Sequence, residues 1–126
     1  MGAKVSFLSG STFILSVIIV SFYLSSCKKE AVDIFDCAGL TPTYTADIKP
    51  ILDVSCAKSG CHNAATAKKG VNLSNYASAS AVSQEARFLG AIQHKQGYAK
   101  MPDDGPKLAD SKIELLTCWV QAGSPQ

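Results

Sequence analysis

The chain has 126 residues, room for one small domain, and a nearly balanced charge of 12 Lys and Arg against 10 Asp and Glu. It carries no basic stripe, which argues against a nucleic acid as partner. Five cysteines are a high count for this length, and because disulfides persist in oxidising compartments and not in the cytosol, the compartment of the protein matters first.

Residues 1–26 have the features of an export signal. Lys4 gives a positive start, and the apolar run FILSVIIVSFYL at 13–24 is shorter than the roughly 20 apolar residues of a membrane span. LSSC at 24–27 resembles the lipobox of bacterial lipoproteins, in which the cysteine is lipidated and becomes the new N-terminus. This resemblance implies a lipid anchor at Cys27, on the periplasmic side of a membrane, in the outer membrane or at the cell surface. The alternatives are an uncleaved anchor helix and an ordinary cleaved signal.

Three parts are therefore expected: a signal peptide at 1–26, a lipid-anchored tether at 27–43 and a folded domain at 44–126. Residues 28–43 are polar without a sustained period, as in a tether. Residues 44–56 suit a short helix with Thr45 as N-cap, and Pro50 predicts that its regular part begins near Lys49.

The following elements alternate between loops and helices. Residues 63–78 are rich in Asn, Gly, Ser and Ala and are expected to form a loop, residues 81–95 have apolar side chains at helical spacing, and residues 96–110 form another loop. The clearest helix is 111–123, with a capping box from Ser111 to Glu114, Gly123 as its C-terminal cap and a wide apolar face. No strand is expected. The fold class is all-α, and the few large aliphatic residues predict that another group completes the core.

The motif SCAKSGCHN at 55–63 places Cys56, Cys61 and His62 together. A zinc site is one interpretation, but neighbouring side chains such as Cys61 and His62 diverge, and the paired short-spaced motifs of zinc folds are absent. A Cys56–Cys61 disulfide is another, and it leaves His62 unexplained. Covalent haem attachment uses both cysteines and the adjacent histidine, usually as Cys-x-x-Cys-His. Here four residues separate the cysteines, a spacing that also occurs in known multihaem cytochromes, and Ser59 and Gly60 could let the extra residues loop out.

The segment GYAKMPDDGPKLADSKIELLTCWVQAGSP at 97–125 resembles the C-terminal half of small monohaem, class I-like c-type cytochromes. DIKPILDVSC at 47–56 resembles the helix that leads into their haem attachment site. The resemblance covers residues 44–125. It implies a cytochrome c-like helical domain wrapped around one covalently bound haem c, with iron as the metal, and electron transfer between exported redox partner proteins. The sequence shows no spare acid-base constellation, so no enzymatic activity is expected.

Carried onto this sequence, the resemblance makes Cys56 and Cys61 the thioether anchors and His62 and Met101 the axial ligands of the iron. His94 is the alternative to Met101, and an open site is the third possibility. Trp119 is expected to pack near the haem or the N-terminal helix. Since the terminal segments approach each other in this fold, Cys37 and Cys118 are expected to form a disulfide; two free thiols are the alternative.

Two functions are alternatives to electron transfer: a five-coordinate haem sensor or peroxidase-like enzyme, and a haem-free surface lipoprotein stabilised by disulfides. Asp103 and Asp104 follow Met101 closely, but an Asp-Asp-Gly-Pro run is typical of a turn and not of a catalytic pair.

Overall fold

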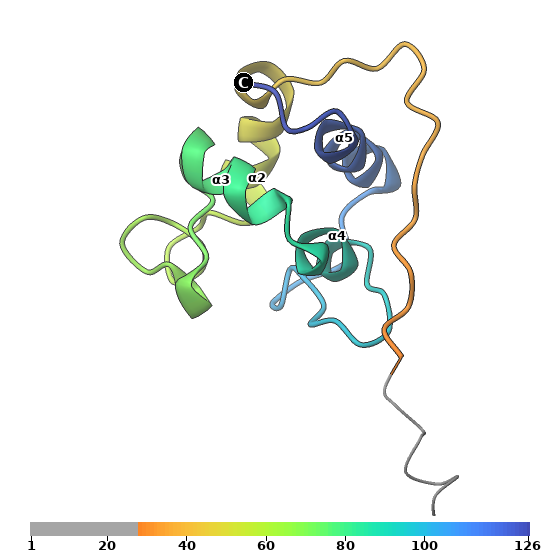
Figure 1. Cartoon of the computed structure of the whole chain (residues 1–126). Coiled ribbons are helices and arrows are strands. Elements are labelled where there is room, and N and C mark those ends of the chain that lie inside the picture. Colours follow the sequence, from red (N-terminus) through yellow and green to blue (C-terminus); the bar gives the residue numbers. More distant parts are fainter. Residues whose placement is uncertain (1–27) are drawn as a thin grey trace, which may run out of the picture.

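The computed structural model describes residues 28–126; Cys27 and the predicted signal peptide lie outside the described residues. Within that range the regular elements are all helical and no strand occurs, so the all-α prediction is confirmed (Figure 1). In chain order they are the π turn η1 (Tyr44–Ile48), α2 (Lys49–Ser55), the short 3₁₀ turn η2 (Lys68–Gly70), α3 (Tyr76–Ser83), α4 (Ala86–Ile92) and α5 (Asp110–Gln121).

The first helix starts two residues earlier than the sequence suggests. Its N-cap is Thr43 and not Thr45: the Thr43 hydroxyl accepts a hydrogen bond from the Ala46 N–H at 3.4 Å. The Thr43 N–H donates to the Asp47 carboxylate at 2.8 Å. The predicted start of the regular helix near Lys49 is confirmed, since α2 begins there with Pro50 in its first turn.

The single helix expected over residues 81–95 is wrong. Two helices, α3 and α4, stand in its place, and Glu85 between them has an extended conformation. The helix α3 also takes residues 76–78 from the predicted loop, because the Asn75 side chain caps it by accepting from the Ser78 N–H at 3.0 Å. The end of α3 contacts the C-terminal segment: the hydroxyls of Ser83 and Ser124, both buried, lie 2.7 Å apart.

The last helix ends as predicted but begins differently. Its N-cap is Ala109, so Ser111 lies inside α5 and the proposed Ser111–Glu114 capping box is wrong. Gly123 follows the helix with a φ of +82°, a left-handed conformation that glycine adopts without strain. The N–H of Gly123 donates to the Val120 carbonyl at 3.0 Å, and the N–H of Ser124 donates to the Trp119 carbonyl at 2.8 Å.

The core lies where the first and last helices meet. The Tyr44 and Trp119 rings have their centroids 6.2 Å apart, and the Trp119 indole N–H donates to the Pro125 carbonyl at 2.7 Å. Helix α4 closes the other end of the same core with its buried apolar side chains. The hydrophobic cluster consists of Tyr44, Ile48, Ile51, Leu52, Leu73, Ala79, Phe88, Leu89, Ile92, Leu116 and Trp119. Over residues 28–126, no helix combines the length and the apolar character needed to cross a bilayer.

Candidate functional site

The Cys-x4-Cys-His motif forms a tight loop directly after α2. Cys56 is the C-cap of that helix. The N–H of Cys61 donates to the Lys58 carbonyl at 3.0 Å, which closes a four-residue turn. Gly60 is the third residue of the turn, and its φ of +77° is a left-handed conformation that glycine adopts without strain. The N–H of His62 then donates to the Cys56 carbonyl at 3.1 Å, so the turn absorbs the longer spacer and returns the chain to Cys56.

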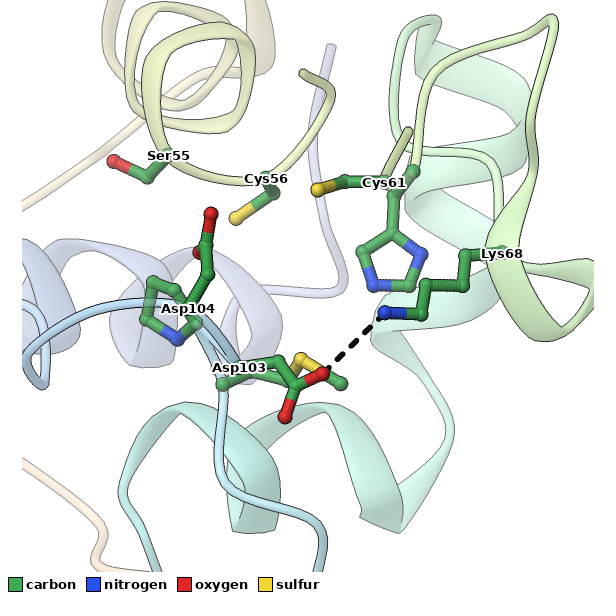
Figure 2. A pocket seen from close by; sticks show the side chains of 9 residues that line it. Ser55, Cys56, Cys61, Lys68, Asp103 and Asp104 are labelled. Atoms are coloured by element: carbon green, nitrogen blue, oxygen red, sulfur yellow. Dashed lines mark hydrogen bonds and ion pairs between the residues drawn. The ribbon is translucent and has the colours of Figure 1, made fainter. Parts of the chain in front are cut away.

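The two cysteines of this loop are free thiols, and both are half-buried. Figure 2 shows their sulfur atoms turned toward the same space at the edge of a pocket. Burial raises the pKa of the Cys56 thiol to about 11, so without a bound group this thiol is protonated at neutral pH. Moreover, residues 28–126 contain no cluster of three or more His, Cys, Asp or Glu side chains arranged to hold a metal ion.

The His62 ring is oriented by a main-chain contact. Its Nδ1 lies 3.2 Å from the Val71 carbonyl oxygen. A carbonyl oxygen can only accept, so Nδ1 donates this hydrogen bond, and in the neutral ring Nε2 then carries the lone pair. A hydrogen bond from one ring nitrogen to a carbonyl is the usual arrangement of a histidine that binds a metal through the other nitrogen.

Two adjoining cavities open between the cysteine loop and the loop that carries Met101. Their volumes are about 170 and 350 Å³, and Cys56, His62 and Met101 line both. The larger cavity is lined by apolar side chains from several segments and has charged residues at its rim. The apolar residues are Val71, Leu73, Val82, Phe88, Ala91, Ile92 and Ala99.

Of the two predicted distal ligands, Met101 lines the cavities and His94 lines neither of them. The ring Nε2 of His94 instead lies 3.0 Å from the main-chain oxygen of Met101. The structure thus brings Cys56, Cys61, His62 and Met101 together around one space. His94 lies outside this space, in contact with the main chain of Met101. This donor set fits haem c: two thiols for the thioethers, an imidazole nitrogen and a thioether sulfur for the iron, and an apolar lining for the porphyrin.

Two ion pairs join the loops on either side of the smaller cavity. Lys58 lies 3.2 Å from Asp104. Lys68 lies 3.3 Å from Asp103, the pair drawn in Figure 2. The hydrogen bond from Lys58 is also the main reason that the pKa of Asp104 is lowered. Sequence reasoning assigned Asp103 and Asp104 to a turn and missed these contacts, because nothing local signals partners 35 and 46 residues away.

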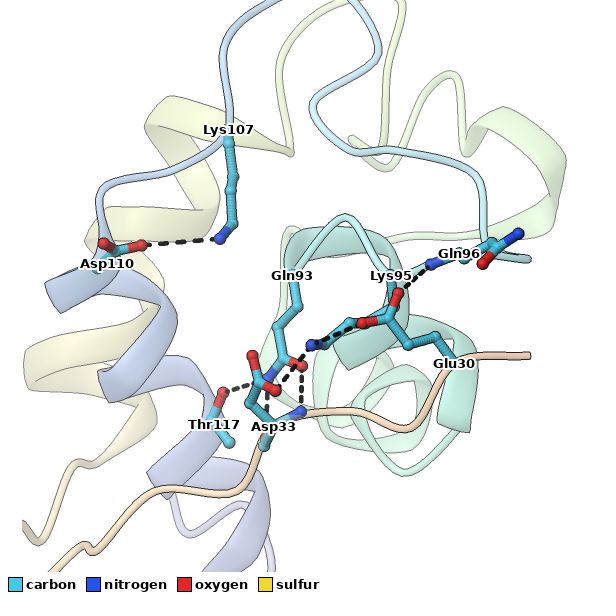
Figure 3. Close-up of polar contacts among 8 residues, drawn as sticks. All are labelled: Glu30, Asp33, Gln93, Lys95, Gln96, Lys107, Asp110 and Thr117. Carbon is cyan, nitrogen blue, oxygen red and sulfur yellow. Dashed lines mark hydrogen bonds and ion pairs between the residues drawn. The ribbon is translucent and has the colours of Figure 1, made fainter. Parts of the chain in front are cut away.

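Residues 28–37 were predicted as part of a tether, and the structure packs them along the domain as an extended segment, here called the strap (Figure 3). The Gln93 side-chain amide makes two hydrogen bonds to the main chain of Asp33, at 2.6 and 3.0 Å. Lys95 pairs with Glu30 at 3.1 Å and with Asp33 at 2.7 Å. The strap therefore holds residues 93–96, which lead into the Met101 loop.

The strap ends at a disulfide. Cys37 is bonded to Cys118 on α5, with their Cα atoms 5.6 Å apart. This bond joins the two cysteines that the sequence analysis paired and leaves only Cys56 and Cys61 as free thiols in the described residues.

Comparison of the chain with models of protein families, with curated proteins and with solved structures finds no match. The residues and the geometry of the site are therefore the basis for proposing a function.

Proposed function

We propose that this protein transfers electrons as a monohaem cytochrome c. Cys56 and Cys61 hold one haem c per chain through thioether bonds, and His62 and Met101 are its axial ligands. In this proposal the all-α domain wraps around the haem, which completes the core that the aliphatic side chains alone leave small.

One observation carries the proposal: the contact of Nδ1 with the Val71 carbonyl oxygen orients the His62 ring and leaves Nε2 as the ring nitrogen available for a metal, in a cavity that His62 shares with Met101 and the free thiol of Cys56. A disulfide between Cys56 and Cys61 would not explain why the His62 ring is held in this orientation. A zinc site would need further ligands close by.

The residues around the cavity favour electron transfer over catalysis. The iron of a bound haem c exchanges single electrons between its ferrous and ferric states. With His62 and Met101 both bound to the iron, no coordination position would be left for a substrate, and methionine ligation would raise the reduction potential. The apolar lining of the larger cavity would suit the porphyrin of a bound haem. The runner-up, a five-coordinate sensor or peroxidase-like enzyme, requires that Met101 stays off the iron.

The proposed working place is outside the cytoplasm, at a membrane surface. The basis is LSSC at 24–27 after the short apolar run, with Cys27 as the lipidated residue and exported redox proteins as partners. Mass spectrometry of the mature N-terminus tests the anchor. A lipid-modified Cys27, lost in Cys27→Ser, is expected, and an unmodified N-terminus at another residue would refute it.

The haem itself is tested on the exported protein by a pyridine haemochrome spectrum and by peroxidase-type staining after denaturing electrophoresis. A covalent haem survives both. A protein without any haem spectrum would instead be the third alternative, a surface lipoprotein stabilised by its disulfide.

A further inference from the structure

His94 contacts the main chain of Met101 from behind the cavity. It follows the C-terminal end of α4 with a φ of +58°, a left-handed conformation that few residues other than glycine adopt. Its half-buried ring brings Nε2 to 3.0 Å from the Met101 carbonyl oxygen. Because that oxygen can only accept, the ring nitrogen donates the hydrogen bond.

Met101 is held at both of its main-chain polar groups. Its N–H donates to the Ala91 carbonyl at 3.1 Å, and its carbonyl accepts from the His94 ring. The Ala91 carbonyl also accepts from the His94 N–H at 3.2 Å. The end of α4 thus fixes the orientation of the Met101 backbone, and with it the direction in which the thioether enters the cavity.

The chain between His94 and Met101 is a loop packed back onto α4. The Lys95 N–H donates to the Gly90 carbonyl at 2.9 Å. The Tyr98 ring lies so close to Gly90 that a Cβ atom there would come within 2.5 Å of Tyr98 Cγ. The bond from the His94 ring closes this loop at its base, where Met101 leaves it.

We infer that His94 is a positioning residue for Met101: it holds the methionine carbonyl, and thereby keeps the sulfur on the iron. The inference rests on the proposed function, since it assigns His94 a role toward one of the proposed ligands. Without the ring donor the Met101 carbonyl loses a half-buried partner, and the sulfur leaves the iron more often. The loss of one hydrogen bond corresponds to roughly a fivefold rise in the ratio of detached to bound methionine.

The test uses the oxidised, haem-loaded protein and added imidazole, which competes with the Met101 sulfur for the iron. The apparent affinity of imidazole for the iron rises in proportion to the fraction of protein in which the Met101 sulfur is detached. His94→Leu removes the donor, and His94→Gln is the matched variant that retains an N–H at a similar reach. His94→Asn serves if the leucine variant does not fold, because asparagine tolerates the left-handed conformation and its amide is too short to reach Met101.

The expected result is roughly fivefold tighter imidazole binding in His94→Leu and His94→Asn, and wild-type binding in His94→Gln. Met101→Ala sets the upper limit, and the haem content of every variant is counted by the haemochrome spectrum. Unchanged imidazole binding in His94→Leu, with Met101→Ala binding tightly, overturns the inference and leaves the cytochrome proposal intact. Loss of low-spin iron in His94→Leu but not in Met101→Ala overturns it also, because His94 is then itself the ligand. Wild-type protein without covalent haem refutes the proposed function and the inference with it.

Discussion

The ring of Tyr98 packs directly on Gly90 of α4, where a Cβ atom would approach Tyr98 Cγ to 2.5 Å. This contact places the first half of the Met101 loop on the helix. Gly90 is buried and has an ordinary helical backbone, so alanine would be the better residue for the helix by about 1 kcal/mol if Tyr98 were absent.

Gly90→Ala is therefore expected to lower the free energy of unfolding by about 1–3 kcal/mol, the usual effect of an added group in a filled space. Urea denaturation of the single variant and of Gly90→Ala in a Tyr98→Ala background measures it. In that background the same change should be neutral or stabilising. Equal effects of Gly90→Ala in both backgrounds would show that Tyr98 does not pack on Gly90.

Met101 is expected to control the spectrum and the potential of the loaded protein. Met101→Ala should abolish the weak sulfur-to-iron band at the red end of the oxidised spectrum and lower the reduction potential, because the thioether ligand is lost. Met101→Leu is a control of similar size without sulfur and should behave in the same way. If the wild type lacks the band, and His94→Ala but not Met101→Ala changes the spin state, the protein is instead a bis-histidine cytochrome.

The disulfide between Cys37 and Cys118 should contribute strongly to stability. Its closure spans 81 residues of sequence, and on the chain-entropy model a loop of this length stabilises by about 4 kcal/mol. The double variant Cys37→Ala/Cys118→Ala removes the bond without placing a polar group at the buried position 118. Its free energy of unfolding should fall by roughly 2–5 kcal/mol.

Thiol labelling of the unfolded, unreduced protein checks the pairing itself. Neither Cys37 nor Cys118 should react before reduction. Labels on both residues would show that they are free in the protein.

The helices whose ends carry local signals were the most predictable part of the fold. Gly123 and Pro50 act through their own backbone conformations, so their consequences could be read from the sequence. The break between α3 and α4 lies within a stretch of continuous helical periodicity, and the contact of Ser83 with Ser124 beside it comes from the far end of the chain, where no local pattern signals it. Ser111 with Glu114 had the right spacing for a capping box, but the helix starts earlier.

The candidate site likewise has residues that the sequence predicted and contacts that it did not. Cys56, Cys61 and His62 are adjacent in sequence, so their proximity followed from the motif. The position of Met101 relative to them was an expectation from resemblance. The Val71 partner of His62 and the lysines that meet Asp103 and Asp104 depend on how distant loops fold together, and no local pattern identifies them.

The docking of the strap should weaken in acid. The N–H of Gln96 and then Lys95 lower the pKa of Glu30. A carboxyl group whose pKa is lower in the folded state stabilises that state above its unfolded pKa, and the contribution disappears as the pH falls through the lowered value. The contact is therefore complete at neutral pH and is lost only as the pH falls below the ordinary glutamate range.

An NMR titration follows the Glu30 carboxyl group and the Gln96 amide together. Glu30 should titrate below the ordinary glutamate range, and the Gln96 amide should shift with the same midpoint. Lys95→Met should raise the pKa of Glu30 part of the way, since the Gln96 N–H remains, and Glu30→Gln should remove the pH-dependent shift of that amide. A Glu30 that titrates normally in the wild type would contradict the contact.

Covalent haem at Cys56 and Cys61 is the central claim, and the pyridine haemochrome spectrum of the exported protein tests it most directly. The spectrum should report one haem per chain with both vinyl groups converted to thioethers, and acid-acetone should extract none of it. Cys56→Ser or Cys61→Ser should give the shifted spectrum of a haem held by one thioether. A wild-type protein that shows no haemochrome spectrum, or whose haem is fully removed by acid-acetone, would contradict the account.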